Sequence, residues 1–277
     1  MTIESIVITD LDGTLLDYYS YSFEPSLEGI KLLSRYNIPL IFCTSKSYAE
    51  VIYFREKTGN TSPFIVENGG AIYFPKGQFA RFESLKGSNN FTQFDNYITL
   101  ELGASYKKIR EVFEQIKTMF NNKVIGFGDM SVEEVAKYLN LEPKLAALAK
   151  IRRHDEPFIL RDPSILEEVK QFVENKGLKV YPGTRFYHLM GNTDKGTAVK
   201  KLVSMYESVY SKLIVAGIGE GKNDEPMFKE VDMPFLVKKP DGSFTNVSID
   251  NIIRIDAIGP YGFTVAIKMF LDKLGLK

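Results

Sequence analysis

Two aspartates flank a single leucine near the N-terminus, in the stretch "IVITDLDGTLLD" that spans residues 6–17. The apolar residues 6–8 predict a strand buried on both faces, as in a parallel sheet covered by helices. Side chains repeat every second residue in an extended chain, so Asp10 and Asp12 can point the same way. Two carboxylates at one strand end can divide the roles of nucleophile and proton donor between them.

Three further polar groups occur later in the chain: Thr44 in "FCTSK", Lys195 in "NTDKG", and the acids of the loop "GEGKND". We expect all of them at the carboxyl ends of strands, where ligands bind in open parallel sheets. Each group alone has a structural interpretation. Asp10 and Asp12 could end a solvated turn, Thr44 could cap a strand end, and Lys195 could begin a solvated helix. Only their order along the chain favours a common site.

Together these groups suit phosphoryl transfer. A carboxylate that attacks a phosphoryl group forms an aspartyl-phosphate, and Asp10 is placed for that step. Asp12 can protonate the leaving oxygen and then deprotonate water. Lys195 and Thr44 would hold phosphate oxygens. Mg²⁺ takes oxygen ligands, so Asp10, the main-chain carbonyl of Asp12 and an acid from "GEGKND" form a plausible set.

Composition excludes several other classes. The 277 residues carry 35 Lys plus Arg and 35 Asp plus Glu, so no overall positive field favours nucleic acid or an anionic membrane. No segment has the length and apolarity of a membrane span, and we expect a cytoplasmic protein. The single cysteine, Cys43, excludes intramolecular disulfides and Cys-cluster metal sites. No GxSxG elbow of a serine hydrolase is present.

The pattern of elements predicts two parts. Strands alternate with helices in residues 1–83 and again in 191–277, whereas strands and helices mix in 84–190. We expect an α/β fold in which a Rossmann-like, doubly wound and mainly parallel sheet forms a catalytic core from 1–83 and 191–277. Residues 84–190 would form an inserted α+β cap domain.

The motifs "DLDGTLLD", "FCTSK", "NTDKGTAV" and "GIGEGKNDEPMF" resemble the four signatures of the haloacid dehalogenase-like hydrolase superfamily, in its Cof-type branch. The resemblance spans essentially the whole chain and implies a core of that type with a C2B cap. It also implies the roles of individual residues. Asp10 is the nucleophile and Asp12 the general acid and base, Thr44, Ser45 and Lys195 hold phosphate, and Glu220, Asn223 and Asp224 form the metal loop, with Asn223 also facing phosphate.

Within that branch, "CTSKSYAEVIYFREKTG", "PFIVENGGAI" and "RRHDEPFIL" resemble the mannosyl-3-phosphoglycerate phosphatase family. The resemblance implies an Mg²⁺-dependent phosphatase that forms mannosylglycerate, a compatible solute, from a small phosphorylated sugar-glycerate. That family usually has Asp where this chain has Glu220, so Glu220 could bind the metal directly or through water. Asp10, Asp12, Glu220 and Asp224 are the expected metal-site residues.

A phosphoglycerate ester also carries a carboxylate, which planar arginines bind well. Arg152, Arg153 and Arg185 of the expected cap are therefore candidates for that contact, although surface salt bridges are their alternative role. The remaining candidates for substrate binding are Lys46, Asn68, Gly69, Gly70 and His188. For residues 68–70 the alternative is a plain hairpin turn.

Other functions share part of this pattern. A Cof-type phosphatase for another sugar phosphate or a phosphoglycolate-like acid would have the same core residues. A receiver-like signalling module also combines Asp, Mg²⁺ and Lys, but has no need of Asp12 or of the long insertion in 84–190. Metal-free dehalogenase chemistry is disfavoured by Asp12 and the acidic loop.

Overall fold

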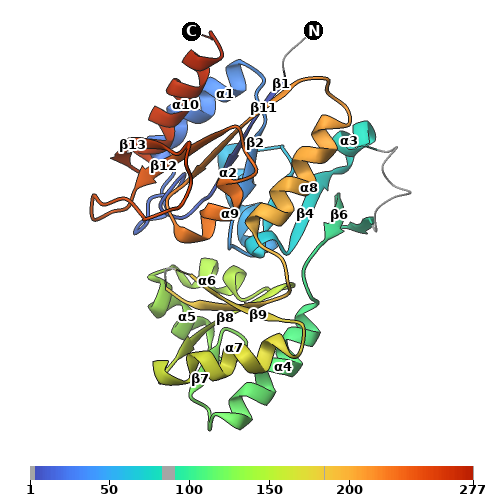
Figure 1. Cartoon of the computed structure of the whole chain (residues 1–277), viewed down its shortest axis with the longest axis vertical. Helices are drawn as coiled ribbons and strands as arrows, with labels where there is room; N and C mark the ends of the chain where they lie inside the picture. The colour runs from blue at the N-terminus through green and yellow to red at the C-terminus, as the bar shows by residue number, and fades with distance from the viewer. Residues whose placement is uncertain (1–3, 83–90, 184, 277) are drawn as a thin grey trace.

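The computed structural model describes residues 4–82, 91–183 and 185–276. The chain forms a larger body built on one sheet and a smaller body built on another, stacked end to end (Figure 1). Within the described part of the chain, no helix is long and apolar enough to cross a membrane.

Among the described residues, nine strands form the large sheet in the order β13-β12-β11-β1-β2-β3-β4-β6-β5. Strands β13 to β3 in this order run parallel, and β4, β6 and β5 pair antiparallel. Their bounds are β1 (Glu4–Thr9), β2 (Leu40–Cys43), β3 (Phe64–Val66), β4 (Ala71–Pro75), β5 (Phe91–Phe94), β6 (Tyr97–Glu101), β11 (Leu213–Gly219), β12 (Met233–Lys238) and β13 (Ile253–Ile258).

Helices cover both faces of this sheet, because alternate strand residues are apolar on both sides. Val7 packs on the face covered by α1, α2 and α10, and Ile6 and Ile8 pack on the face covered by α3, α8 and α9. The bounds are α1 (Leu27–Arg35), α2 (Tyr48–Thr58), α3 (Lys76–Phe79), α8 (Lys195–Glu207), α9 (Glu225–Phe228) and α10 (Tyr261–Lys273). The doubly wound, mainly parallel α/β core predicted from the sequence is confirmed.

The smaller body is an antiparallel sheet with the order β7-β8-β10-β9 within the described residues. One apolar cluster joins it to α4 and α7, and a second, on the other face, joins it to α5 and α6. The bounds are β7 (Val124–Gly126), β8 (Asp155–Leu160), β9 (Lys179–Pro182), β10 (Tyr187–Met190), α4 (Tyr106–Met119), α5 (Val132–Leu139), α6 (Pro143–Ala149) and α7 (Leu166–Glu174).

The pairing of β5 and β6 differs from the predicted division of the chain. The residues of both strands were assigned to the insertion 84–190, but β6 pairs with β4 and with β5, so both strands extend the large sheet. The predicted boundary at 83–84 itself lies outside the described residues. We keep the division into core and cap as a proposal, with its first boundary moved past Glu101.

The turn between β3 and β4 joins the two bodies. The Glu67 carboxylate, at the start of the short 3-10 helix Glu67–Gly69, accepts the main-chain N–H of Arg153 (3.0 Å) and of His154 (2.7 Å). Gly69 has φ +91°, and a Cβ there would lie 2.1 Å from the Asp194 carbonyl oxygen. A Cβ on Gly70 would lie 2.4 Å from that of His154. These close approaches explain the glycines as packing positions at a joint.

We expect Glu67→Ala to lower the free energy of unfolding by about 1.5–3 kcal/mol, since hydrogen bonds from two buried amides to this side chain are lost. Urea denaturation at fixed pH measures the change. Glu56→Ala, on the exposed side of α2, is the matched control and should stay within about 0.5 kcal/mol of the parent. An equal effect of both substitutions would contradict the role of Glu67 as the joint.

Candidate active site

Asp10 stands at the carboxyl end of β1, between the neighbouring parallel strands β11 and β2. Its main-chain N–H donates to the Ile218 carbonyl oxygen (2.9 Å), which continues the ladder by one residue. The residue as a whole is 6% exposed. This is the sheet edge where the sequence places the candidate nucleophile.

Lys195 reaches Asp10 from a helix. It is the first residue of α8, which Asp194 caps by accepting the Thr197 N–H. The buried ammonium lies 2.6 Å from Asp10 Oδ1 and 2.6 Å from Asp224 Oδ1. The expectation that Lys195 follows a strand of the parallel sheet is wrong, because the strand before it, β10, belongs to the smaller sheet.

Asp224 organises the loop after β11. Its Oδ2 accepts the main-chain N–H groups of Glu220 (3.0 Å) and Gly221 (2.9 Å), while Oδ1 receives Lys195. A Cβ on Gly219 would lie 2.5 Å from Asp224 Oδ2, so only glycine leaves room for this carboxylate. Both oxygens of Asp224 are therefore engaged, and its contribution here is to hold Lys195 and the loop.

Negative charge exceeds positive charge around Lys195. Burial raises the pKa of Asp10 to about 7, although Lys195 opposes the shift. Burial, followed by the charges of Asp224 and Asp10, raises the pKa of Glu220 to about 8. Lys195 and, more weakly, Lys239 oppose the shift of Glu220, so negative charge still dominates around these carboxylates. Because oxygen donors in excess of positive charge suit a hard cation, the donor set fits Mg²⁺.

The described residues contain no group of three acidic, histidine or cysteine side chains that converge as a complete metal site. The set expected from the sequence does not need one, since it combines Asp10 and one loop acid with the main-chain carbonyl of Asp12. Glu220 is the acid of this loop whose carboxylate is available to bind a metal ion. Within the described residues its carboxylate accepts no hydrogen bond, and it lies against Gly13, where a Cβ would be 3.2 Å from its Cγ.

The side chains of residues 44–46, directly after β2, point in different directions. Thr44 is fully buried, and its hydroxyl oxygen accepts the N–H of Lys46 (3.1 Å) rather than facing the cavity described below. Ser45 and Lys46 do face that cavity. The Lys46 ammonium lies 2.9 Å from Asp12 Oδ1 and 3.3 Å from Glu50 Oε1. Lys46, predicted to bind substrate, is thus paired with the predicted general acid.

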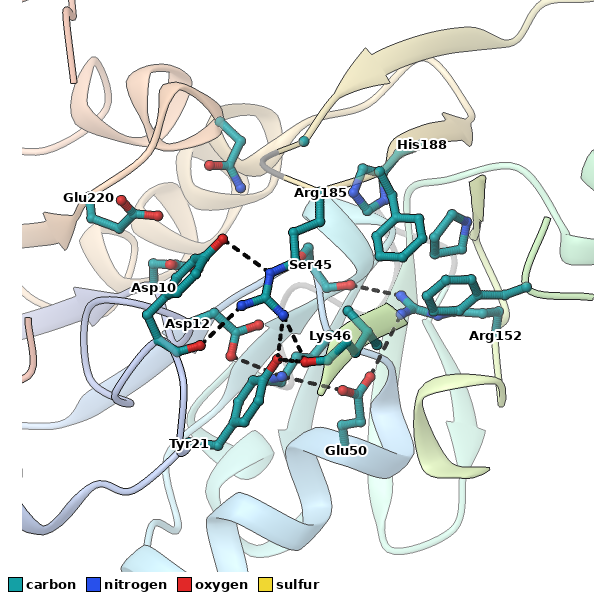
Figure 2. A pocket seen from close by; sticks show the side chains of 17 residues that line it. Asp10, Asp12, Tyr21, Ser45, Lys46, Glu50, Arg152, Arg185, His188 and Glu220 are labelled. Atoms are coloured by element: carbon teal, nitrogen blue, oxygen red, sulfur yellow. Dashed lines mark hydrogen bonds and ion pairs between the residues drawn. The ribbon is translucent and has the colours of Figure 1, made fainter. Parts of the chain in front are cut away.

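A cavity of about 100 Å³ lies between the two bodies, and Figure 2 shows the side chains around it. The larger body contributes mainly polar side chains to it, and the smaller body contributes mainly aromatic and basic side chains. Its lining residues are Asp10, Asp12, Tyr18, Tyr21, Ser45, Lys46, Glu50, Phe127, Leu139, Arg152, Pro157, Gly183, Arg185, Phe186, His188, Glu220 and Asn223. This volume holds several water molecules.

Several predicted residues lie outside this cavity. Asn68, Gly69 and Gly70 form the joint described above, because their turn packs against the connections between the bodies. Arg153 points away from the cavity, with its guanidinium 2.9 Å from Glu101 and over the Phe94 ring at 4.1 Å. We therefore do not assign these residues to substrate binding.

The two cap arginines that do line the cavity already have partners. Arg152 Nη1 donates to the Ser45 carbonyl oxygen (2.7 Å). Arg185 donates to the hydroxyls of Tyr18 (3.0 Å) and Tyr21 (3.3 Å) and to the Leu139 carbonyl oxygen (2.7 Å). Both arginines therefore connect the smaller body to the larger one.

His188 is differently placed. Its Nδ1 lies 2.7 Å from the buried Asp155 Oδ2, and both residues face the larger body from paired strands β10 and β8. Gly183 lies beside Nε2, where a Cβ would approach to 2.6 Å. The glycine therefore keeps the second ring nitrogen accessible from the cavity.

Some lining residues were not predicted. Glu50 belongs to the capping box of α2 with Ser47, and this local role is the one that its sequence context suggests. Its spacing of four residues from Lys46 is the signal that could have revealed its contact with that side chain. Tyr18 and Tyr21 follow the "DGTLLD" motif directly, and an aromatic cluster so close to the nucleophile is a comparable signal.

Comparisons with known proteins agree with this geometry. The haloacid dehalogenase-like hydrolase family matches residues 7–244. The chain is 40% identical over 270 residues to a glucosyl-3-phosphoglycerate/mannosyl-3-phosphoglycerate phosphatase of Methanococcoides burtonii, covering 97% of each chain. It is 35% identical over 250 residues to a mannosyl-3-phosphoglycerate phosphatase of Pyrococcus furiosus, covering 90% of this chain and 96% of the relative.

Solved structures share the fold at lower identity. A Synechocystis sucrose-phosphatase crystallised with sucrose and phosphate is similar with a TM-score of 0.62 and 13% identity, covering 97% and 98% of the two chains. A haloacid dehalogenase-like hydrolase of Bacteroides thetaiotaomicron is similar with a TM-score of 0.66 and 13% identity, covering 96% and 99%.

We expect Lys195→Met to destabilise the metal-free protein by about 3–5 kcal/mol, because Asp10 and Asp224 lose their shared buried cation. The double variant Lys195→Met/Asp224→Asn should recover part of that loss, since one of the unpaired charges is gone. Urea denaturation in EDTA measures both. A single variant as stable as the parent would show that Lys195 is not needed to hold these carboxylates.

Proposed function

We propose, from the premise that this chain belongs to the haloacid dehalogenase-like hydrolase family, that it is a phosphatase that hydrolyses hexosyl-3-phosphoglycerates, mannosyl-3-phosphoglycerate among them, to the hexosylglycerate and phosphate. The observation that supports this reaction most directly is the position of the Asp10 carboxylate, which lies 2.6 Å from a buried lysine and lines the cavity between the two bodies. The names of the relatives support the substrate.

In the first step an oxygen of Asp10 attacks phosphorus and the ester P–O bond breaks. The electron pair of that bond goes to the leaving glycerate oxygen, which takes a proton from Asp12. Lys195 offsets the charge on Asp10 and keeps the carboxylate aligned, because it is itself held by Asp224. The product alcohol leaves, and the aspartyl-phosphate remains.

In the second step the Asp12 carboxylate takes a proton from water, and the water oxygen attacks phosphorus. The bond between phosphorus and Asp10 breaks, which releases phosphate and restores both aspartates. One carboxyl group therefore serves both proton transfers. Ser45 and Asn223, which line the same cavity as Asp10, are the groups available to hold the phosphate oxygens, whereas the Thr44 hydroxyl accepts the Lys46 N–H.

Mg²⁺ would be held by Asp10, Glu220 and the main-chain carbonyl of Asp12, and when bound it neutralises charge on the phosphoryl oxygens. The excess of carboxylates over ammonium groups supports this assignment. Asp224 would not bind the metal directly but would hold Lys195 and the loop in place, because both of its oxygens already accept hydrogen bonds.

The cap supplies selectivity in this proposal. His188 is the cap group whose second ring nitrogen is accessible from the cavity and whose first is held by Asp155. We assign it to the glycerate or hexose part of the substrate. The aromatic side chains Phe127 and Phe186, 4.9 Å apart between ring centroids, form the apolar wall beside it.

The decisive experiment measures phosphate release from mannosyl- and glucosyl-3-phosphoglycerate. We expect turnover that EDTA abolishes and Mg²⁺ restores, and we expect Asp10→Asn to reduce it to background while the protein stays folded by circular dichroism, because an amide cannot act as the nucleophile. Full turnover in metal-free enzyme, or more than a few per cent of activity in pure Asp10→Asn, would refute the mechanism. Turnover of other sugar phosphates alone would favour the broader Cof-type phosphatase.

His188→Ala should lower kcat/KM for mannosyl-3-phosphoglycerate by roughly 10-fold or more, the value of one hydrogen bond to a charged group. The same variant should retain kcat/KM for p-nitrophenyl phosphate, which has neither carboxylate nor sugar. Arg153→Ala, outside the cavity, is the control. Equal losses on both substrates would remove His188 from substrate recognition.

A further inference from the structure

We infer that Lys46, Glu50 and the cap residue Arg152 form a chain of contacts that positions Asp12. Asp12 is then oriented to protonate the leaving group only when the cap lies against the core. The inference rests on the proposed function, since it assigns Asp12 the role of general acid. In Figure 2 the chain runs below the cavity from Asp12 through Lys46 and Glu50 to Arg152.

The first contact fixes Asp12. Its side chain is 34% exposed, so it has room to adopt other rotamers, whereas the Asp10 side chain is 8% exposed. The Lys46 ammonium holds Asp12 Oδ1 at 2.9 Å and leaves Oδ2 as the oxygen for the substrate. Proton transfer depends on this orientation, because the acid must lie within hydrogen-bond reach of the leaving oxygen.

The second contact fixes Lys46. Its ammonium is buried over the rings of Tyr21 (4.8 Å to the centroid) and Phe54 (5.5 Å), and Glu50 Oε1 lies 3.3 Å away. Burial acts to lower the pKa of Lys46, but Asp12 and Glu50 raise it overall, so the side chain stays charged. A buried ammonium needs both carboxylates as partners, and Glu50 therefore decides where it sits.

The third contact comes from the cap. Arg152 Nη2 lies 3.7 Å from Glu50 Oε2, and its Nη1 donates to the Ser45 carbonyl oxygen. Arg152 and Glu50 side chains are each 5% exposed or less. Because Arg152 belongs to the smaller body, these contacts form only when the two bodies close. The cap thus completes the charge balance that holds Lys46 against Asp12.

The capping box alone does not account for this arrangement. Glu50 Oε2 accepts the Ser47 N–H (2.9 Å), which satisfies the helix start, and a glutamine would satisfy it equally. Capping the helix therefore does not require the negative charge of Glu50. Glu50→Gln therefore keeps the cap of α2 and removes only the negative charge between Lys46 and Arg152.

The test compares phenyl phosphate with p-nitrophenyl phosphate at saturating Mg²⁺. The two esters differ in how much the leaving oxygen needs a proton, and neither carries a sugar or carboxylate. We expect Glu50→Gln and Arg152→Met to lower kcat/KM for phenyl phosphate by about 10-fold, part of the roughly 10²–10⁴-fold that general acid catalysis supplies. The value for p-nitrophenyl phosphate should stay within about twofold.

Glu56→Gln, exposed on the same helix, and Arg161→Met, exposed on the cap, are matched controls and should leave both values unchanged. Circular dichroism and thermal unfolding verify that each variant is folded. Equal losses on both esters in Glu50→Gln and Arg152→Met indicate a general structural role and would overturn the inference, as would no loss on either. If the parent enzyme turns over neither aryl ester nor the hexosyl-phosphoglycerates, the proposed function itself fails.

Discussion

The contact of one buried ammonium with two buried carboxylates is the interaction on which this structure depends. Removing three charges from water is costly unless each finds its partners in good geometry. Lys195 can meet Asp10 and Asp224 only if α8 begins where it does and the loop after β11 is bent around Gly219. The close approach of Gly69 to the Asp194 carbonyl then places the joint of the two bodies at the start of the same helix. The candidate site and the joint between the two bodies thus share one set of contacts.

Some side chains that hold the two bodies together could also bind a ligand. Arg152 and Arg185 donate to main-chain carbonyls and tyrosine hydroxyls of the opposite body or of the cavity wall. An arginine has five N–H donors, so it can join two surfaces and still face the space between them. A ligand in that space would then meet groups whose positions depend on closure. In the proposed function, such groups would couple the selection of substrate to the exclusion of water.

Local sequence patterns predict structure well where the structure depends only on neighbouring residues. The capping box of Ser47 and Glu50, the left-handed C-cap at Gly59 and the turn before Gly70 each depend on only a few neighbouring residues. The same locality limited their interpretation. Glu50 satisfies its own helix start, so nothing in the pattern indicated the arginine about a hundred residues away. The alternating pattern of β6 indicates a strand, but the pattern of one strand does not show which sheet that strand will join.

By itself the sequence determined the α/β class, the position of Asp10 and Asp12 at the end of β1, and the chemistry that these carboxylates can perform. It did so because strand periodicity and residue type are properties of short segments. Tertiary structure alone decided which arginines face the cavity, that residues 68–70 form a joint, and that Lys46 pairs with Asp12 and Glu50. Those outcomes depend on how two separately folded surfaces meet, and the pairing of buried charges across that boundary is settled only when both surfaces are in place.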